Sequence, residues 1–142
     1  MMQAAMSGSF EFIDHTGDIG LRVRADTLTD LFTLAARGMY EILAEAPDLR
    51  PQRTADIVVE GETDELLRGW LAELLYRFSV DEMIFCGFDI NVAPGRLTAQ
   101  ARGQKMDRAI HAVRTELKAV TYHGLSVRRE GAEWVAEVIF DV

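Results

Sequence analysis

The sequence predicts a single α+β domain, in which a mostly antiparallel sheet of about six strands carries two amphipathic helices packed on it. The 142 residues suffice for one hydrophobic core but not for two ordinary domains. Only two segments show the apolar spacing of an amphipathic helix. Elsewhere apolar and polar residues mostly alternate, and the strand patterns gather after the second helix, which is typical of an α+β fold.

The domain is expected to cover residues 10–142, with residues 1–9 as a disordered N-terminal tail. Those nine residues are uncharged and lack the basic and apolar regions of a signal peptide. No stretch approaches the ~20 apolar residues that span a bilayer. The single cysteine, Cys86, excludes an intramolecular disulfide, and its apolar neighbours favour an inert buried thiol. We therefore expect a cytoplasmic protein.

The first predicted element is a strand over Phe10–Arg24. Its odd-numbered residues from Ile13 onward are mostly apolar and its even-numbered residues are mostly polar, which is the pattern of a half-buried strand. Gly17 and Gly20 indicate that a bulge or bend interrupts its pairing.

Both predicted helices have one apolar face, so each should lie against a sheet. The first follows Thr27, a suitable cap, and should end before Pro47, because the residue preceding a proline is pushed out of the helical region. Thr63 is the expected cap of the second, with Asp64 and Glu65 near its positive end. Its apolar face consists of Leu66, Leu67, Trp70, Leu71, Leu74, Leu75 and Phe78.

Five further segments have the alternation of strands. One lies between the two helices, two form a hairpin around a Pro-Gly turn, and two follow at the C-terminal end. In the first of that last pair, the apolar phase slips by one residue at His123-Gly124, which predicts a β-bulge. The five segments are Asp56–Glu60, Ile84–Val92, Leu97–Ala101, Leu117–Arg129 and Glu133–Val142.

The charge balance disfavours direct binding to nucleic acid. Such binding draws most of its affinity from Lys and Arg on phosphates, whereas this chain has a net charge of −8 and no basic run. An acidic protein is better suited to metal ions or to a basic protein surface. No membrane association is expected.

Several carboxylates are candidates for a cation site. Asp14 and Asp18, four residues apart on the predicted strand, should share its polar face, and Asp141 and Glu137 share the polar face of the last one. If these strands are neighbours, the acids repel each other unless water or a cation neutralises them. The α-carboxylate of Val142 would reach the same place. Such hard oxygen ligands suit Ca²⁺, Mg²⁺ or Mn²⁺, but solvated acids on an exposed sheet face give the same pattern.

The three histidines carry weaker signals. His15 lies on the apolar side of its strand, which favours a hydrogen-bonded core residue. His123 falls at the predicted bulge, where functional and structural roles are equally open. His111, four residues after Asp107, is more simply incidental than catalytic. Nucleotide-binding, zinc-protease and GxSxG motifs are absent from the sequence, which weakens an enzymatic hypothesis.

Three separated motifs resemble the archease family. Phe12–Gly20 is similar to its D/E-H-T-A-D-hydrophobic-G pattern, with Gly17 in place of the usual alanine. Leu117–Leu125 resembles its V-K-A-V-T-Y-H-G-L motif, and Val138–Val142 resembles its hydrophobic-Asp-Ile or -Val ending. The resemblance extends over the whole predicted domain.

This resemblance implies an accessory protein and not an enzyme. Archeases act with an RtcB-type RNA ligase in tRNA splicing and RNA repair, where they promote GTP-dependent guanylylation of the ligase's histidine and its multiple turnover. Motif positions imply a divalent metal, Ca²⁺ first with Mg²⁺ or Mn²⁺ as alternatives, held by Asp18, Asp141 and Val142. Four residues of the same motifs are candidates for supporting or partner-contact roles: Asp14, His15, Lys118 and His123.

Two alternatives stay open. One is a chaperone-like scaffold, in which the acidic residues only keep the surface soluble. The other is a small metal-dependent hydrolase that uses the same carboxylates, with His123 as its base.

Overall fold

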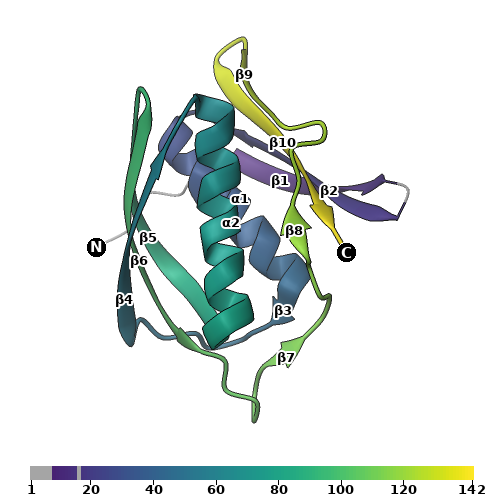
Figure 1. Cartoon of the computed structure of the whole chain (residues 1–142), viewed down its shortest axis with the longest axis vertical. Helices are drawn as coiled ribbons and strands as arrows, with labels where there is room; N and C mark the ends of the chain where they lie inside the picture. Colours follow the sequence, from purple (N-terminus) through teal and green to yellow (C-terminus); the bar gives the residue numbers. More distant parts are fainter. Residues whose placement is uncertain (1–7, 16) are drawn as a thin grey trace.

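The computed structural model describes residues 8–15 and 17–142. In this part of the chain, two helices lie between two antiparallel sheets (Figure 1). The helices are α1 (Leu28–Leu43) and α2 (Thr63–Asp81). Neither has the length and hydrophobicity needed to cross a membrane. The α+β class is confirmed, although the strands form two main sheets instead of one.

The larger sheet pairs the beginning of the chain with its end. Its strand order is β1-β2-β10-β8, and β9 also pairs with β10, so β10 lies in the middle of the sheet. Residues 1–7 of the predicted tail lie outside the described residues, whereas Gly8 and Ser9 already belong to β1. The five strands are β1 (Gly8–His15), β2 (Asp18–Ala25), β8 (Ala119–Val120), β9 (Ser126–Glu130) and β10 (Glu133–Asp141).

The prediction of one strand over Phe10–Arg24 is wrong, because this segment is a hairpin. His15 lies opposite Asp18, so the chain reverses direction between these two residues. Gly17 has φ 75°, in the left-handed region that glycine adopts without steric cost. The alternation continues on both sides of the turn, so a straight strand and a hairpin give nearly the same sequence pattern.

The helix limits follow their caps. The Thr27 hydroxyl accepts a hydrogen bond of 3.1 Å from the backbone of Asp30, as a capping residue should. The cap of α2 is Glu62, one residue before the predicted Thr63. The Glu65 side chain accepts a 2.9 Å hydrogen bond from the Glu62 backbone, as in a capping box. The helix α1 ends at Leu43, where the two-residue strand β3 (Ala44–Glu45) begins.

The core lies between the sheets, around the two helices. Trp70 of α2 is fully buried, and its Nε1–H donates a 3.0 Å hydrogen bond to the carbonyl oxygen of Phe32 in α1. Gly38 allows α1 to approach β2, because a Cβ at this position would lie 2.8 Å from Leu21 Cδ1. The helices therefore hold the inner face of the larger sheet and leave its outer face open.

The smaller sheet contains the predicted hairpin. Its order is β4-β6-β5, with β4 (Arg53–Glu60), β5 (Met83–Ala93) and β6 (Arg96–Lys105). The register shifts between Phe85 and Gly87, so Cys86 lies at a bulge. The thiol is half-buried instead of buried, and its partial burial raises its pKa. A two-stranded ribbon pairs β3 with β7 (Ala112–Val113).

The predicted strand Leu117–Arg129 is divided into β8 and β9. Val120 pairs with Phe140 and Ser126 pairs with Glu137, so residues 121–125 face only residues 138–139 of β10. This interruption is larger than the one-residue bulge that the phase slip predicted. Thr121 holds the start of the loop, since its backbone N–H and its hydroxyl both donate to the Ile139 carbonyl oxygen at 3.0 Å.

Candidate metal centre

Two aspartates from distant parts of the chain lie side by side at one end of the larger sheet. Asp18 of β2 is directly opposite Asp141 of β10. Directly opposite residues project from the same face, with their Cβ atoms about 4.5–5.5 Å apart. Asp18 is half-buried and Asp141 is exposed. Figure 1 shows β2 and β10 as neighbouring strands of the larger sheet.

This pair belongs to the outer face of the sheet, away from the helices. The residue before Asp141, Phe140, is fully buried, so the next side chain along the strand points outward. Val142 follows directly and is half-buried, with its side chain packed against the core. The third expected ligand, the α-carboxylate of Val142, therefore belongs to a residue whose side chain the core holds in place.

The backbone at this end of β10 is fixed on both sides. Asp141 pairs with Asp18 of β2 on one side and with Ala119 of β8 on the other. The Lys118 N–H donates a 2.8 Å hydrogen bond to the Asp141 carbonyl oxygen, while the Lys118 side chain is exposed. The carboxylate of Asp141 thus stands on a paired strand and not on a frayed end.

The prediction that Asp14 and Asp18 share a face is wrong. Asp14 lies opposite Ile19 in the β1–β2 pairing, and Ile19 lies opposite Phe140. That row faces the helices, although Asp14 itself is exposed at the edge of the sheet. The hairpin turn causes the difference, because it reverses the chain between the two aspartates.

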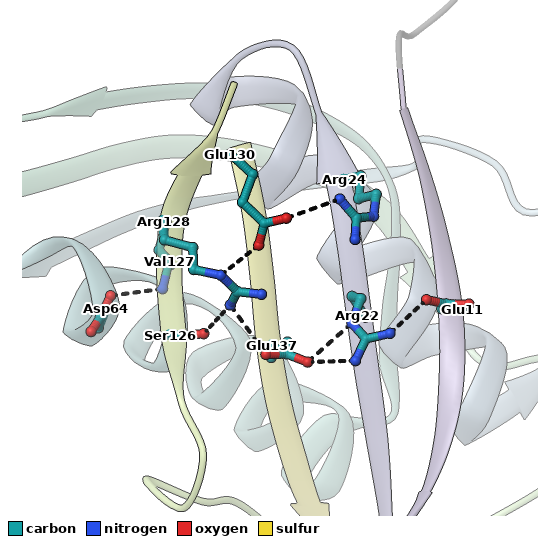
Figure 2. A network of polar contacts seen from close by, with 9 residues as sticks. All are labelled: Glu11, Arg22, Arg24, Asp64, Ser126, Val127, Arg128, Glu130 and Glu137. Carbon is teal, nitrogen blue, oxygen red and sulfur yellow. Dashed lines mark hydrogen bonds and ion pairs between the residues drawn. The ribbon is translucent and has the colours of Figure 1, made fainter. Parts of the chain in front are cut away.

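Glu137 shares the outer face with Asp141 but is neutralised by arginines. Its Oε1 accepts hydrogen bonds from Arg22 Nε at 3.0 Å and Nη2 at 2.8 Å, and its Oε2 accepts one from Arg128 Nη1 at 3.1 Å (Figure 2). These hydrogen bonds, above all that from Arg22, hold the pKa of Glu137 below its ordinary value. The acidic row therefore consists of Asp18 and Asp141 without Glu137.

The same arginines tie four strands together. Arg22 on β2 also donates to Glu11 on β1 at 3.0 Å, and Arg128 on β9 donates to Glu130 at 2.7 Å (Figure 2). Sequence reasoning placed Arg22 on the polar face but did not assign it this role. The signal was available, because alternation puts arginines and glutamates on one face of neighbouring strands.

The histidines fall into three different settings. The backbone of His15 lies opposite Asp18, but its side chain lies outside what the structure describes. His123 is exposed in the loop of residues 121–125, and its N–H donates to Thr121 Oγ1 at 3.2 Å. A Cβ added to Gly124 would lie 3.2 Å from Ile139 Cδ1, so this loop lies close against the outer face. Ile139 is two residues from Asp141, about 6.6 Å along the strand.

His111 has a structural position. It is 3% exposed, its Nδ1 accepts a 2.9 Å hydrogen bond from the Asp107 N–H, and its Nε2 lies 2.8 Å from the Pro47 carbonyl oxygen. Nδ1 accepts, so Nε2 carries the proton and donates to Pro47. The ring therefore joins the turn after β6 to the segment after β3.

The donor set fits a hard divalent cation. Carboxylate oxygens are the ligands that Ca²⁺ and Mg²⁺ prefer, and two carboxylates face each other at Asp18 and Asp141. Among the side chains that the structure describes, which do not include that of His15, no group of three or more His, Cys, Asp or Glu is arranged to hold a metal ion. The described carboxylates of Asp18 and Asp141 therefore form a pair and not a complete ligand set.

The fold and this site place the chain among small α+β proteins, with an acidic pair at one end of its larger sheet. Residues 10–142 match the model of the Archease protein family (MTH1598/TM1083). The chain belongs to the archease family.

Its relatives agree in sequence and in fold. Proteins named archease from Methanopyrus kandleri and Methanosarcina barkeri are 36% and 34% identical to it; the alignments cover 94% of this chain and 99% and 95% of theirs. The solution structure of a Methanobacterium thermoautotrophicum protein has a TM-score of 0.82 at 30% identity, covering 94% of this chain and 98% of that one. A Thermotoga maritima archease, described as a possible chaperone, shares the fold, with a TM-score of 0.63 at 19% identity, covering 100% and 98%.

Proposed function

We propose that this protein binds a divalent cation at the Asp18–Asp141 pair and activates an RtcB-type RNA ligase in tRNA splicing and RNA repair. In this role it promotes GTP-dependent guanylylation of the ligase's histidine and the ligase's multiple turnover. The register that sets the two aspartates opposite each other carries the proposal. Membership of the archease family supports it.

Asp18, Asp141 and the α-carboxylate of Val142 would hold the cation, with Ca²⁺ as the first expectation and Mg²⁺ or Mn²⁺ as alternatives. Like charges directly opposite each other destabilise a sheet, so a cation between the aspartates relieves a cost that the fold itself imposes. When bound, the cation supplies positive charge that can neutralise nucleotide phosphates. The protein's own contribution is to hold both carboxylates on backbone that is paired on each side.

The charge of the chain supports a protein partner. A net charge of −8 favours a basic protein surface over direct contact with RNA. Lys118 and His123, both exposed on segments that adjoin β10, are two of the four supporting or partner-contact candidates. Docking on the ligase would then bring the acidic pair to the ligase's nucleotide site.

Single-turnover guanylylation of a purified ligase tests this role. Asp18→Ala and Asp141→Ala should each abolish the stimulation while far-UV circular dichroism stays unchanged. Asp56→Ala is the matched control, because it removes the same charge from an exposed position on β4 of the smaller sheet, away from the aspartate pair. Full stimulation by both test variants, or equal loss with Asp56→Ala, would refute the proposal.

Metal binding is measured separately by calorimetric titration with Ca²⁺, Mg²⁺ and Mn²⁺. Removing either aspartate should weaken binding by at least about tenfold, since even changes around metal ligands cost ~10–100-fold. Deleting Val142 should weaken it as well, because the terminal carboxylate then moves to another residue. If deleting Val142 leaves the affinity for the metal ions unchanged, Val142 is not a ligand, and the assignment of the two aspartates is unaffected.

A chaperone-like scaffold is the second candidate, and it is favoured by the description of the Thermotoga maritima relative as a possible chaperone. In that role the acids serve solubility alone, so the double variant Asp18→Asn/Asp141→Asn would keep full function. A metal-dependent hydrolase would instead turn over phosphoesters without a partner. Incubation of the isolated protein with Mn²⁺ and such substrates separates this third function from the other two.

A further inference from the structure

A cavity of about 480 Å³ lies beside α1, where the helix leads into β3. Small-molecule sites typically measure about 300–1,000 Å³ and combine apolar walls with a few polar groups. Its apolar walls include Phe10 of β1, Phe85 of β5 and Leu49 of the segment between β3 and β4. Arg37 and Tyr40 of α1 supply polar groups. None of its lining residues belongs to the candidate metal centre.

The hydroxyl of Tyr40 is buried in this wall without a partner. The residue is 9% exposed, and its hydroxyl makes no hydrogen bond to any residue that the structure describes. Buried polar groups are nearly always hydrogen-bonded, so an unpaired one requires an explanation. Burial raises the pKa of the hydroxyl by more than the nearby Phe85 backbone lowers it. The group therefore keeps its proton and remains a donor.

Arg37 brings an uncompensated positive charge to the same cavity. It lies one turn before the tyrosine, is exposed, and forms no ion pair or hydrogen bond with the described residues. The second guanidinium of the wall is already engaged, since Arg114 Nη1 lies 3.5 Å from Glu41 Oε2 and 3.2 Å from the Glu41 carbonyl oxygen. The other acid of the wall, Glu45, is exposed to solvent, which screens its charge.

We propose that this cavity binds a small organic carboxylate with an aromatic or branched apolar body. Arg37 pairs with the carboxylate, and Tyr40 donates its free hydrogen bond to the same group. A guanidinium and a carboxylate match in shape as well as in charge, and this favours a carboxylate over a neutral head group. The apolar body then lies against Phe10, Leu49 and Phe85.

Titration with 1-naphthylacetate, followed by ¹H–¹⁵N NMR, tests the site directly. The amides of residues that line the cavity should shift, and the carboxylate should bind about tenfold more tightly than neutral 1-naphthylacetamide, because a charge-assisted hydrogen bond is lost in the amide. Equal affinity of the two compounds, or shifts confined to other parts of the chain, would overturn the proposal.

Two variants assign the polar contacts. Arg37→Gln should weaken the carboxylate about tenfold and remove its preference over the amide. Tyr40→Phe should weaken it about fivefold, yet leave the Tm of the ligand-free protein unchanged or higher, because the hydroxyl has no partner to lose. Arg96→Gln, on the β5–β6 hairpin and outside the cavity, is the matched control. A lower Tm for Tyr40→Phe with unchanged binding means that the hydroxyl is satisfied within the protein, and the proposal fails.

Cys86 provides an internal reporter. It is the single cysteine of the chain, it is half-buried, and it lines the same cavity. Bound 1-naphthylacetate should slow the reaction of this thiol with N-ethylmaleimide. An unchanged rate at saturating ligand would show that the apolar body does not occupy this wall, which contradicts the proposed pose.

Discussion

At the scale of single residues, the main feature is the cost of placing Asp18 opposite Asp141. The pairing of β2 with β10 makes the half-buried Asp18 and the exposed Asp141 direct neighbours. Like charges in this position destabilise a sheet. Under the proposed function, a cation held between the two carboxylates would offset this cost.

Replacing one of these charges should therefore have opposite effects with and without metal. With a chelator present, Asp141→Asn should raise the Tm slightly, because the repulsion between the two carboxylates disappears. With Ca²⁺ at 100 times its Kd, the unchanged protein should gain about 2.7 kcal/mol and the variant much less. Thermal unfolding with and without Ca²⁺ measures both effects. A variant that is less stable than the parent in chelator would contradict this account.

His111 should matter for stability and not for activity. Its ring makes two hydrogen bonds while almost fully buried, so His111→Ala should cost about 2–4 kcal/mol through lost hydrogen bonds and an unfilled space. His123→Ala, on an exposed loop, should cost less than about 0.5 kcal/mol. Urea unfolding compares the two variants. A loss of stability for His111→Ala as small as that expected for His123→Ala would show that the ring of His111 is not structural.

At the scale of the elements, the arginine–glutamate network links β1, β2, β9 and β10 on the outer face (Figure 2). The network lies along the same strands as the candidate metal centre and fixes their register from the other end. Isolated surface ion pairs contribute little, but shared ones such as Arg22–Glu137–Arg128 act as a unit.

This network predicts a pH dependence. The pKa of Glu137 is lowered in the folded protein, so the ionised side chain adds to the free energy of unfolding. This contribution is complete above the ordinary carboxyl pKa of 4.5 and is lost as the pH falls through the lower pKa of the folded state. Glu137→Gln should therefore cost up to about 1 kcal/mol at pH 7, with the difference from the parent vanishing in acid. Urea unfolding from pH 7 to pH 3 measures it. A difference that grows as the pH falls would have the wrong sign.

The elements also show how far the sequence predicts the structure. Apolar periodicity identified both helices and the phases of β10, since a strand buried on one face must alternate. It does not distinguish the β1–β2 turn at Gly17 from a bend within one strand, because the alternation continues on both sides of the glycine. Likewise a phase slip at His123-Gly124 signals an interruption but not its length, which depends on how β8 and β9 each pair with β10.

The candidate site was predictable for a related reason. Asp18 and Asp141 belong to strands whose polar faces could be read from alternation, and only their adjacency had to be assumed. The face of Asp14 could not be read, because it depends on the turn. The cavity at Tyr40 left no sequence signal, since a tyrosine on an apolar helix face resembles any core residue.

At the scale of the whole molecule, one core joins two helices and two sheets. Leu74 of α2 is fully buried within it, whereas Tyr76 on the same helix is 62% exposed. Leu74→Ala should cost about 2–5 kcal/mol, and far-UV circular dichroism and tryptophan fluorescence should still give coincident unfolding curves. Tyr76→Ala should stay within about 0.5 kcal/mol. Separate transitions for the two signals would show that the sheets unfold independently.

The central position of β10 also governs how the chain is made. During synthesis β1 and β2 emerge before the other described strands, whereas β10, which pairs with β2, emerges more than a hundred residues later. Until then β2 exposes an unpaired, apolar edge, the kind of surface on which nascent chains aggregate. The acidic pair therefore forms only when β10 pairs with β2, so the cation of the proposed function would have no site before that step.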